Sequence, residues 1–205
     1  MKMAHLLMDM QSCEFYGFSP QGKVTLIDTV LGLKHDLAKY DVQTITVTSQ
    51  LTDPIVGKAD VVESVLLQRK KFKLSGGRLG LVFPLAANEI VAVKTTCSAY
   101  NEPILQFLQE HKIDTLVFSG LQEGEADVYS EACLTRSAIH FARNFRTIIA
   151  SEGTNYLTRT RGPLPRLSHK ERCDAFAKYG VEVMPVRDIL NMAQTQKAPN
   201  DALIR

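Results

Sequence analysis

Short apolar runs alternate along this chain with longer segments in which apolar residues recur at helical spacing. The runs are bounded by polar residues and read as strands buried on both faces. Six such strands are predicted, at His5–Met10, Thr44–Ser49, Glu89–Lys94, Ile113–Gly120, Arg146–Ser151 and Val181–Pro185. Helices are predicted at Pro20–Tyr40, after a cap at Ser98, at about Asp127–Arg143, at Ser168–Tyr179 and at Val186–Met192.

The alternation of strands and helices determines the expected fold class. Connections long enough for crossovers demand parallel strands with both faces of the sheet covered. We therefore predict an α/β fold, a three-layer doubly wound and mainly parallel six-stranded sheet with helices on both faces. A single domain is expected over residues 1–205, with residues 194–205 as a frayed arm or a segment that packs on a neighbouring subunit.

The region from Gln50 to Pro84 gives the weakest pattern. Val61–Leu67 could form a helix or a strand. The basic run Arg69–Lys73 could bind phosphate, although a solvated face is the simpler interpretation. Ser75–Gly80 is rich in glycine and predicts a mobile loop that could border an active site.

Composition excludes several classes of protein. The chain has 205 residues, 45% of them hydrophobic, and a formal net charge of +2, so no strong field attracts nucleic acid or a membrane surface. Its four cysteines are far apart and form no CxxC motif, which favours reduced thiols in a cytoplasm. No run approaches the roughly 20 apolar residues of a membrane helix, and the apolar N-terminal run is too short for a signal peptide.

Candidate chemistry lies at the carboxyl ends of the predicted strands, where α/β sheets bind ligands. Asp9 and Lys94 end two strands, and Cys133 follows a third. A helix start and an ammonium group can lower the pKa of a thiol, and an Asp can take its proton. Each residue also has a structural interpretation: Asp9 as a cap, Lys94 as a snorkelling side chain, Cys133 as a small buried hydrophobe. No GxGxxG motif follows the first strand, which argues against a dinucleotide fold.

Three motifs in this order carry a resemblance: Leu6–Gln11 (LMDMQ at its core), Val93–Tyr100 (VKTTCSAY), and Thr115–Leu121 followed by Glu131–Leu134 (EACL). Together they resemble the isochorismatase-like cysteine hydrolases, over nearly the whole chain. The resemblance implies that Asp9 is the acid/base, Lys94 the orienting cation and Cys133 the nucleophile. It also implies association into dimers or tetramers.

The resemblance bears on metal and substrate as well. The nicotinamidases of this superfamily bind a metal through an Asp and histidines after the second strand, whereas Gln50–Asp60 contains two Asp residues, Asp53 and Asp60, and no His. We therefore predict no metal and no cofactor. The residues expected to contact a small-molecule substrate are Gln11, Phe15, Tyr100 and Ala132, with Tyr16 and Phe18 nearby. Aromatic residues there suit a flat ligand, but they could equally belong to the core.

The stretch from Gly120 to Cys133 is longer than the short turn of the superfamily, which usually holds a cis peptide and the oxyanion hole. Its acids, Glu123, Glu125 and Asp127, would raise the pKa of a neighbouring thiol. An alternative register would place Ser130 or Ala132 at the nucleophile position. Two hypotheses follow: a cysteine hydrolase of a small-molecule amide or vinyl ether, in which iodoacetamide labels Cys133 fastest, or a catalytically silent binding or assembly protein, in which the acidic loop fills the pocket.

Overall fold

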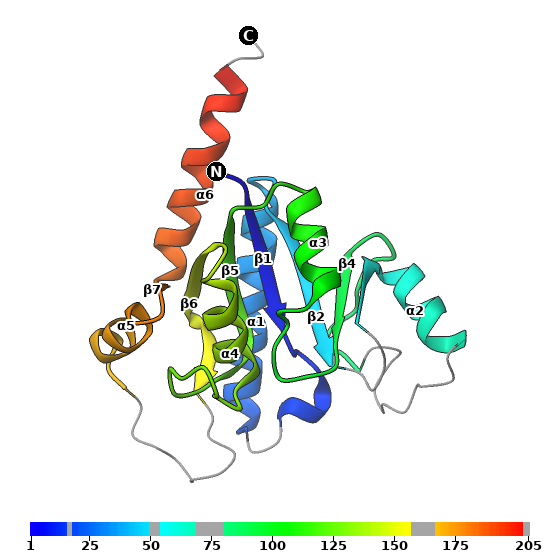
Figure 1. The fold of residues 1–205 in the computed structure, drawn as a ribbon, viewed down its shortest axis with the longest axis horizontal. Helices are drawn as coiled ribbons and strands as arrows, with labels where there is room; N and C mark the ends of the chain where they lie inside the picture. The colour runs from blue at the N-terminus through cyan, green and yellow to red at the C-terminus, as the bar shows by residue number, and fades with distance from the viewer. Residues whose placement is uncertain (16–17, 50–53, 69–79, 157–166, 203–205) are drawn as a thin grey trace.

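The computed structural model describes residues 1–15, 18–49, 54–68, 80–156 and 167–202, and its core is one sheet (Figure 1). The strand order is β3-β4-β2-β1-β5-β6-β7. All neighbours are parallel except β3 and β4, which are antiparallel. The strands are β1 (Met3–Met8), β2 (Gln43–Ser49), β3 (Ile55–Lys58), β4 (Ile90–Lys94), β5 (Thr115–Glu123), β6 (Arg146–Tyr156) and β7 (Val181–Met184).

The direction of winding reverses between β1 and β5. From β1 the chain moves outward through β2 to β4 on one side, and from β5 through β6 to β7 on the other. Such a switch point leaves a crevice at the carboxyl ends of the two central strands, where α/β proteins bind ligands. Residues that follow β1, β4 and β5 are thereby brought to one edge of the sheet.

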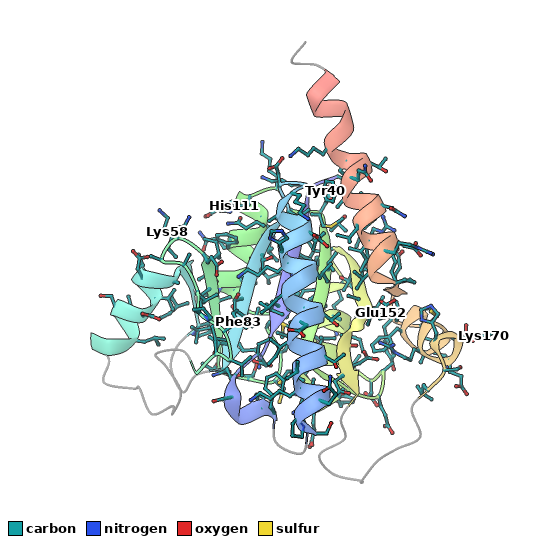
Figure 2. All side chains as sticks on the ribbon, turned by 180° about the vertical axis from the view of Figure 1, so that it is seen from behind. Tyr40, Lys58, Phe83, His111, Glu152 and Lys170 are labelled. Carbon is teal, nitrogen blue, oxygen red and sulfur yellow. The ribbon has the colours of Figure 1, made fainter. Side chains whose placement is uncertain are left out.

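Helices cover both faces of the sheet (Figures 1 and 2). One face carries α1 and α6, and the other carries α3, α4 and α5. The helices are α1 (Pro20–Ala38), α2 (Ala59–Gln68), α3 (Glu102–Glu110), α4 (Cys133–Phe141), α5 (His169–Ala177) and α6 (Val186–Ala202), with a short 3-10 helix, η1 (Ser12–Phe15), after β1. The α/β class and the mainly parallel sheet that the sequence predicted are therefore confirmed.

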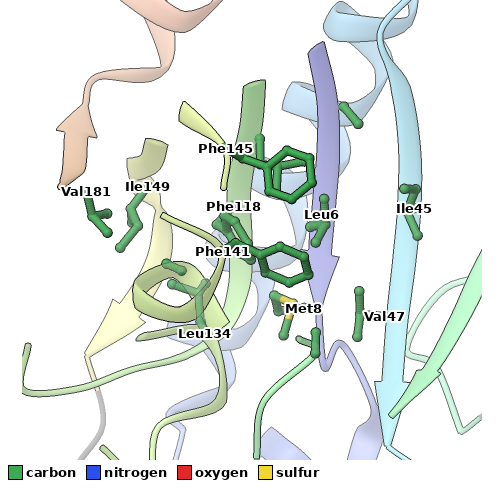
Figure 3. Close-up of a cluster of buried hydrophobic side chains, with 14 of the residues drawn as sticks. Leu6, Met8, Ile45, Val47, Phe118, Leu134, Phe141, Phe145, Ile149 and Val181 are labelled. Carbon is green, nitrogen blue, oxygen red and sulfur yellow. The ribbon is translucent and has the colours of Figure 1, made fainter. Parts of the chain in front are cut away.

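The larger apolar cluster lies between the sheet and α4 (Figure 3). Even-numbered residues of β1, such as Leu6 and Met8, point to this face, because side chains alternate along a strand. They meet Phe118 of β5 and the aromatic rings of Phe141 and Phe145. This packing fixes α4, and with it the start of the helix, against the centre of the sheet.

The number of strands was predicted wrongly, since the sheet has seven strands and not six. The additional strand is β3, a four-residue edge strand whose side chains are half-buried or exposed, so it lacks the buried apolar run that marks the others. The ambiguous segment beside it, Val61–Leu67, lies in helix α2. The basic run Arg69–Lys73 lies outside the described residues, as does the glycine-rich segment from Ser75 except for Gly80.

Helix boundaries differ from the predictions at several points. The cap of α3 is Asn101 and not Ser98, and α4 begins at Cys133, not near Asp127. Ser168, where a helix was predicted to begin, is the N-cap of α5 and forms a capping box with Glu171. Helix α6 continues well beyond Met192, so the segment predicted as a tail from residue 194 is helical as far as Ala202. Within the described residues, no helix combines the length and apolar character needed to cross a membrane.

His5 is a fully buried histidine within the sheet. Its Nδ1 lies 3.1 Å from Thr44 Oγ1 and its Nε2 lies 2.7 Å from Ser119 Oγ, so β1 is linked to both of its neighbours. Burial, with a smaller effect of the Lys34 charge, lowers the pKa of His5 to about 3. A neutral imidazole is therefore part of the folded structure.

We expect this histidine to make the fold sensitive to acid. Because the pKa of His5 is lower in the folded chain than the 6.5 of an exposed histidine, its contribution is complete above pH 6.5 and decreases as the pH falls toward 3. Between pH 7 and about pH 4.5, the free energy of unfolding should fall by roughly 2–3 kcal/mol more in the native chain than in His5→Gln. Urea unfolding at both pH values measures this difference. His35→Gln, at an exposed site on α1, should retain the native pH dependence.

Candidate active site

Asp9, Lys94 and Cys133 meet at the carboxyl edge of the sheet. Lys94 Nζ lies 3.1 Å from Asp9 Oδ2 and 3.3 Å from Cys133 Sγ. Asp9 directly follows β1, Lys94 ends β4, and Cys133 is the first residue of α4. Asp9 and Lys94 are almost fully buried, with 1% of each residue exposed. Three residues distant in sequence thus form one contact cluster.

Ser49 is a fourth member of the cluster that sequence reasoning did not find. It ends β2, which lies between β1 and β4. Its Oγ accepts a hydrogen bond from Lys94 Nζ at 2.7 Å and donates one to Asp9 Oδ1 at 3.1 Å. The hydroxyl group therefore bridges the ion pair. A serine at the end of a predicted strand was the available signal, but its role depends on the strand order.

The backbone after β1 directs Asp9 toward the cluster. Asp9 has a φ of 48°, in the left-handed region that an Asp tolerates better than most residues, and its N–H donates to Val47 O. Gln11 holds the adjacent strand end, because its side-chain amide accepts from Ser49 N–H at 2.9 Å and donates to Ser49 O at 3.2 Å. These bonds fix the end of β2 relative to the end of β1.

Gly120 allows β5 to lie close to β1 beside the cluster. It has a φ of +100°, and a Cβ added there would lie 2.3 Å from Met8 O. Only glycine fits this approach, which brings the strand leading to Cys133 against the strand leading to Asp9. The peptide bond between Leu121 and Gln122, immediately downstream, is cis.

The thiol of Cys133 is protonated at rest. Burial, together with the charge of the Asp9 carboxylate, raises its pKa to about 12, and the Lys94 ammonium opposes both effects without outweighing them. The sequence-based expectation of a lowered thiol pKa is therefore wrong, because burial of the thiol, with the Asp9 charge, outweighs the charge of Lys94. For the same reason we now expect slow, not fast, labelling of Cys133 by iodoacetamide at neutral pH.

Lys94 remains charged despite its burial. Burial by itself would lower the pKa of the ammonium, but the Asp9 carboxylate and Cys133 outweigh that effect, and the net pKa is raised. Its hydrogen bonds go to Ser49 Oγ, Cys133 Sγ and the carbonyl of Thr96, the last at 3.2 Å. Lys94 thus holds a fixed positive charge between the carboxylate and the sulfur.

The segment Gly124–Ala132, which we call the excursion, separates the end of β5 from Cys133. Its two ends meet at the start of α4. Gly124 N–H donates to Thr135 Oγ1 at 2.9 Å, and the Thr135 hydroxyl lies 3.3 Å from Gly124 O. A Cβ added to Gly124 would come within 2.7 Å of Ala132 Cβ. The length of the segment therefore does not separate the end of the strand from Cys133.

The acids of this region do not face the thiol. Glu123 is buried, and its carboxylate pairs with Arg172 of α5, with Nε–Oε1 and Nη2–Oε2 distances of 2.8 and 2.5 Å. Glu125 and Asp127 are exposed. The carboxylate that raises the thiol pKa is Asp9 and not one of these three acids, contrary to the expectation from the sequence.

The predicted substrate-contact residues lie in different surroundings. Phe15 packs in the cluster under α1, and Tyr100 stacks edge-on against Phe141. Gln11 is buried and bonded to Ser49, while Ala132 is the N-cap of α4, next to Cys133. Of the four, Ala132 adjoins the thiol in the chain, and the substrate contacts of all four remain predictions. Tyr16, a further candidate, lies outside the described residues.

The metal site known from related folds has no matching donor set in the described residues. Asp60 is exposed at the start of α2, and its Oδ1 accepts from Val61 N–H. Asp53 lies outside the described residues. Within the described part of the chain, no three His, Cys, Asp or Glu side chains are grouped to hold a metal ion. The absence of a metal ion from the function remains a prediction.

Comparison with known proteins shows which solved structures share this fold. No protein-family model and no curated protein sequence matches the chain significantly. Among solved structures, an isochorismatase-like hydrolase from Alkaliphilus metalliredigens superposes with a TM-score of 0.62 at 17% identity, over 94% of this chain and 99% of its own. N-carbamoylsarcosine amidase from Thermoplasma acidophilum superposes with a TM-score of 0.58 at 19% identity, over 91% of this chain and 97% of its own.

A cysteine hydrolase from Pseudomonas syringae pv. phaseolicola gives a TM-score of 0.65 at 12% identity, over 95% of this chain and 93% of its own. At such identities the likeness shows the fold alone. The chain has the fold of the isochorismatase-like hydrolases, so the resemblance that its sequence motifs indicated is confirmed at this level.

Proposed function

We propose that this protein is a cysteine hydrolase that cleaves a small-molecule amide or related substrate without a metal ion. The observation that carries the proposal is the contact cluster itself, in which Lys94 Nζ lies 3.1 Å from Asp9 and 3.3 Å from the sulfur of Cys133. A nucleophile, a base and a cation in mutual contact at the ligand-binding edge of an α/β sheet form a coherent catalytic set.

The protonated thiol requires a base at the moment of attack. Asp9 and Cys133 interact electrostatically on either side of Lys94 Nζ, so Asp9 can accept the Sγ proton while Sγ attacks the carbonyl carbon of the substrate. The C–N bond then breaks, the departing nitrogen takes the proton from Asp9, and a thioester remains. Water attacks the thioester and gives a proton to Asp9, the C–S bond breaks, and the sulfur recovers that proton.

The start of α4 can stabilise the negative oxygen that forms in each attack. Its N-cap is Ala132, whose side chain offers no hydrogen-bond acceptor to the first-turn N–H groups. Cys133 is the first residue of that turn, so these N–H groups lie beside the attacked carbonyl. Lys94 adds positive charge nearby. Backbone donors and a fixed cation at such a position are the usual means of holding an oxyanion.

The chemistry of proteins with this fold supports an amide as the substrate. One is an N-carbamoylsarcosine amidase, and others are described as a pyrazinamidase and a nicotinamidase. An association into dimers or tetramers and a cytoplasmic location remain predictions from the sequence. Light scattering of the purified chain would measure the first of these.

Hydrolysis of a substrate panel tests the proposal. The panel contains N-carbamoylsarcosine, nicotinamide, pyrazinamide and simple primary amides, with isochorismate as the vinyl ether. We expect turnover of at least one compound, and a loss of about a thousandfold or more in Cys133→Ala. Cys97→Ala, at a half-buried cysteine in the loop after β4, is the matched control and should retain activity.

Equal turnover by Cys133→Ala and the native chain would contradict the proposal. Binding of a panel compound without turnover would instead favour the alternative, a catalytically silent binding or assembly protein. That alternative predicted that the acidic loop fills the pocket, whereas Glu125 and Asp127 are exposed and Glu123 pairs with Arg172.

A further inference from the structure

His140 lies on the outer side of α4 and contacts both loops that flank the cluster. Its Nδ1 lies 3.0 Å from Ser98 Oγ, in the loop between β4 and α3. Its ring also hydrogen-bonds to the backbone carbonyl of Val128, in the middle of the excursion. The two loops come from opposite sides of the switch point, one after Lys94 and the other before Cys133. One imidazole therefore joins them.

The loop after β4 is directly connected to the candidate catalytic groups. Its Thr96 carbonyl accepts from Lys94 Nζ. Its Ala99 N–H donates to the buried Ser137 Oγ at 2.8 Å, and the Ser137 hydroxyl donates to the carbonyl of Cys133 at 2.6 Å. Ser137 and His140 are three residues apart on α4 and so lie on one side of the helix. The position of this loop therefore determines how Lys94 meets the sulfur.

The excursion is closed at its base by Gly124 and Thr135, and Val128 lies at its middle. Val128 is partly buried against the main apolar cluster, while Glu125, Asp127, Tyr129 and Glu131 point to solvent. The bond from His140 to the Val128 carbonyl adds a polar attachment to this packing. It ties the middle of the excursion to α4 about two turns from the nucleophile.

The hydrogen-bond partners of His140 are compatible with the neutral ring. Ser98 Oγ accepts from Tyr100 N–H at 3.1 Å and can donate its hydroxyl hydrogen to His140 Nδ1. Nδ1 is then an acceptor, while Nε2 carries the hydrogen that is donated to Val128. A charged ring can make the same two contacts, because the second lone pair of Ser98 Oγ can accept from Nδ1–H.

We propose that His140 is a positioning residue that joins the two loops around Cys133. The inference rests on the proposed function only for its effect on turnover. The charged groups facing the ring are Arg136 of α4 and Arg143, which follows the C-cap of that helix, and Tyr100 lies edge-on to it. Burial and these two cations lower the pKa of His140, so the neutral form predominates at pH 7.

Two substitutions separate the two contacts. His140→Asn retains an acceptor near the position of Nδ1 and loses the donor to Val128, whereas His140→Gln retains a donor near Nε2 and loses the acceptor for Ser98. Hydrogen exchange by mass spectrometry reports on each loop. We expect exchange of residues 125–131 to accelerate about fivefold in His140→Asn, and that of residues 95–101 to do so in His140→Gln, the factor expected for one lost hydrogen bond.

Alkylation of the thiol is the second readout. In both variants Cys133 should react several-fold faster with iodoacetamide, because released loops expose a thiol whose pKa burial had raised. Turnover of any panel substrate should fall in the same variants.

His111→Asn is the matched control. His111 is the C-cap of α3, its Nδ1 donates to the carbonyl of Phe107, and its ring stacks on that of Phe107, so its contacts lie within α3 and both loops should exchange at native rates. Acceleration throughout the chain in the His140 variants, or native exchange in both loops, would overturn the inference. Localised exchange and faster alkylation without hydrolysis of any panel compound would sustain it and count against the proposed hydrolase.

Discussion

Replacing Lys94 with methionine should abolish hydrolysis and lower the free energy of unfolding by about 3–5 kcal/mol. Activity is lost because the cation between Asp9 and Cys133 is removed. Stability is lost because the Asp9 carboxylate, 1% exposed, keeps its charge without the ammonium 3.1 Å away. A buried charge that has lost its partner costs far more than an intact pair contributes. Chemical denaturation of native and variant chains measures the second effect.

The double variant Lys94→Met/Asp9→Asn separates these two consequences. With both charges removed, much of the stability should return, while activity should remain absent because the base is also missing. Lys34→Met is the matched control, since Lys34 pairs with Glu89 at 2.9 Å where both side chains are partly exposed. It should cost about 1 kcal/mol or less. A Lys94→Met chain as stable as the native one would contradict the assignment of a charged pair.

The second large effect is expected at Arg172. This residue of α5 donates to both oxygens of the buried Glu123, and its Nη1 donates to Ser151 O at 3.2 Å. Thr154 also donates to the same carboxylate. Arg172→Met should lower the free energy of unfolding by about 3–5 kcal/mol, because it leaves a buried carboxylate with a single hydroxyl partner. The pair holds the end of β5, two residues from the cis peptide, against β6 and α5.

The chain contains a matched control for this prediction. Arg146 makes a bidentate pair with Glu182, with distances of 2.7 and 2.9 Å, but both side chains are more than 40% exposed. Arg146→Met should therefore cost about 1 kcal/mol or less. Equal losses from the two substitutions, measured by urea unfolding, would show that burial does not govern the contribution of these pairs.

The sequence was informative wherever a property is local to one strand or helix. Buried apolar runs located the central strands, and the polar residues at their ends, Asp9 and Lys94, were found because parallel strands end at one edge. The helix that carries Cys133 was predicted as well, but its start was placed near Asp127, whereas in the structure it begins at Cys133. The edge strand β3 was not predicted, because it is short and half-exposed.

Properties that depend on strand order or on distant partners could not be read from the sequence. Ser49 joins Asp9 to Lys94 only because β2 lies between β1 and β4. Glu123 is neutralised by an arginine 49 residues away. The thiol pKa depends on how burial and two opposite charges combine, and burial, with the charge of Asp9, reverses the result expected from the residue types alone.

The closed base of the excursion gives the fold a place to vary. Because Gly124 and Ala132 meet beside Thr135, the number of residues between them can change while the ends remain where they are. Lengthening a flexible loop adds little entropic cost once its ends are fixed, so variation at this position is tolerated thermodynamically. Related chains could therefore have different residues around the same sulfur and carboxylate. They could then recognise different substrates while Cys133 and Asp9 keep their positions.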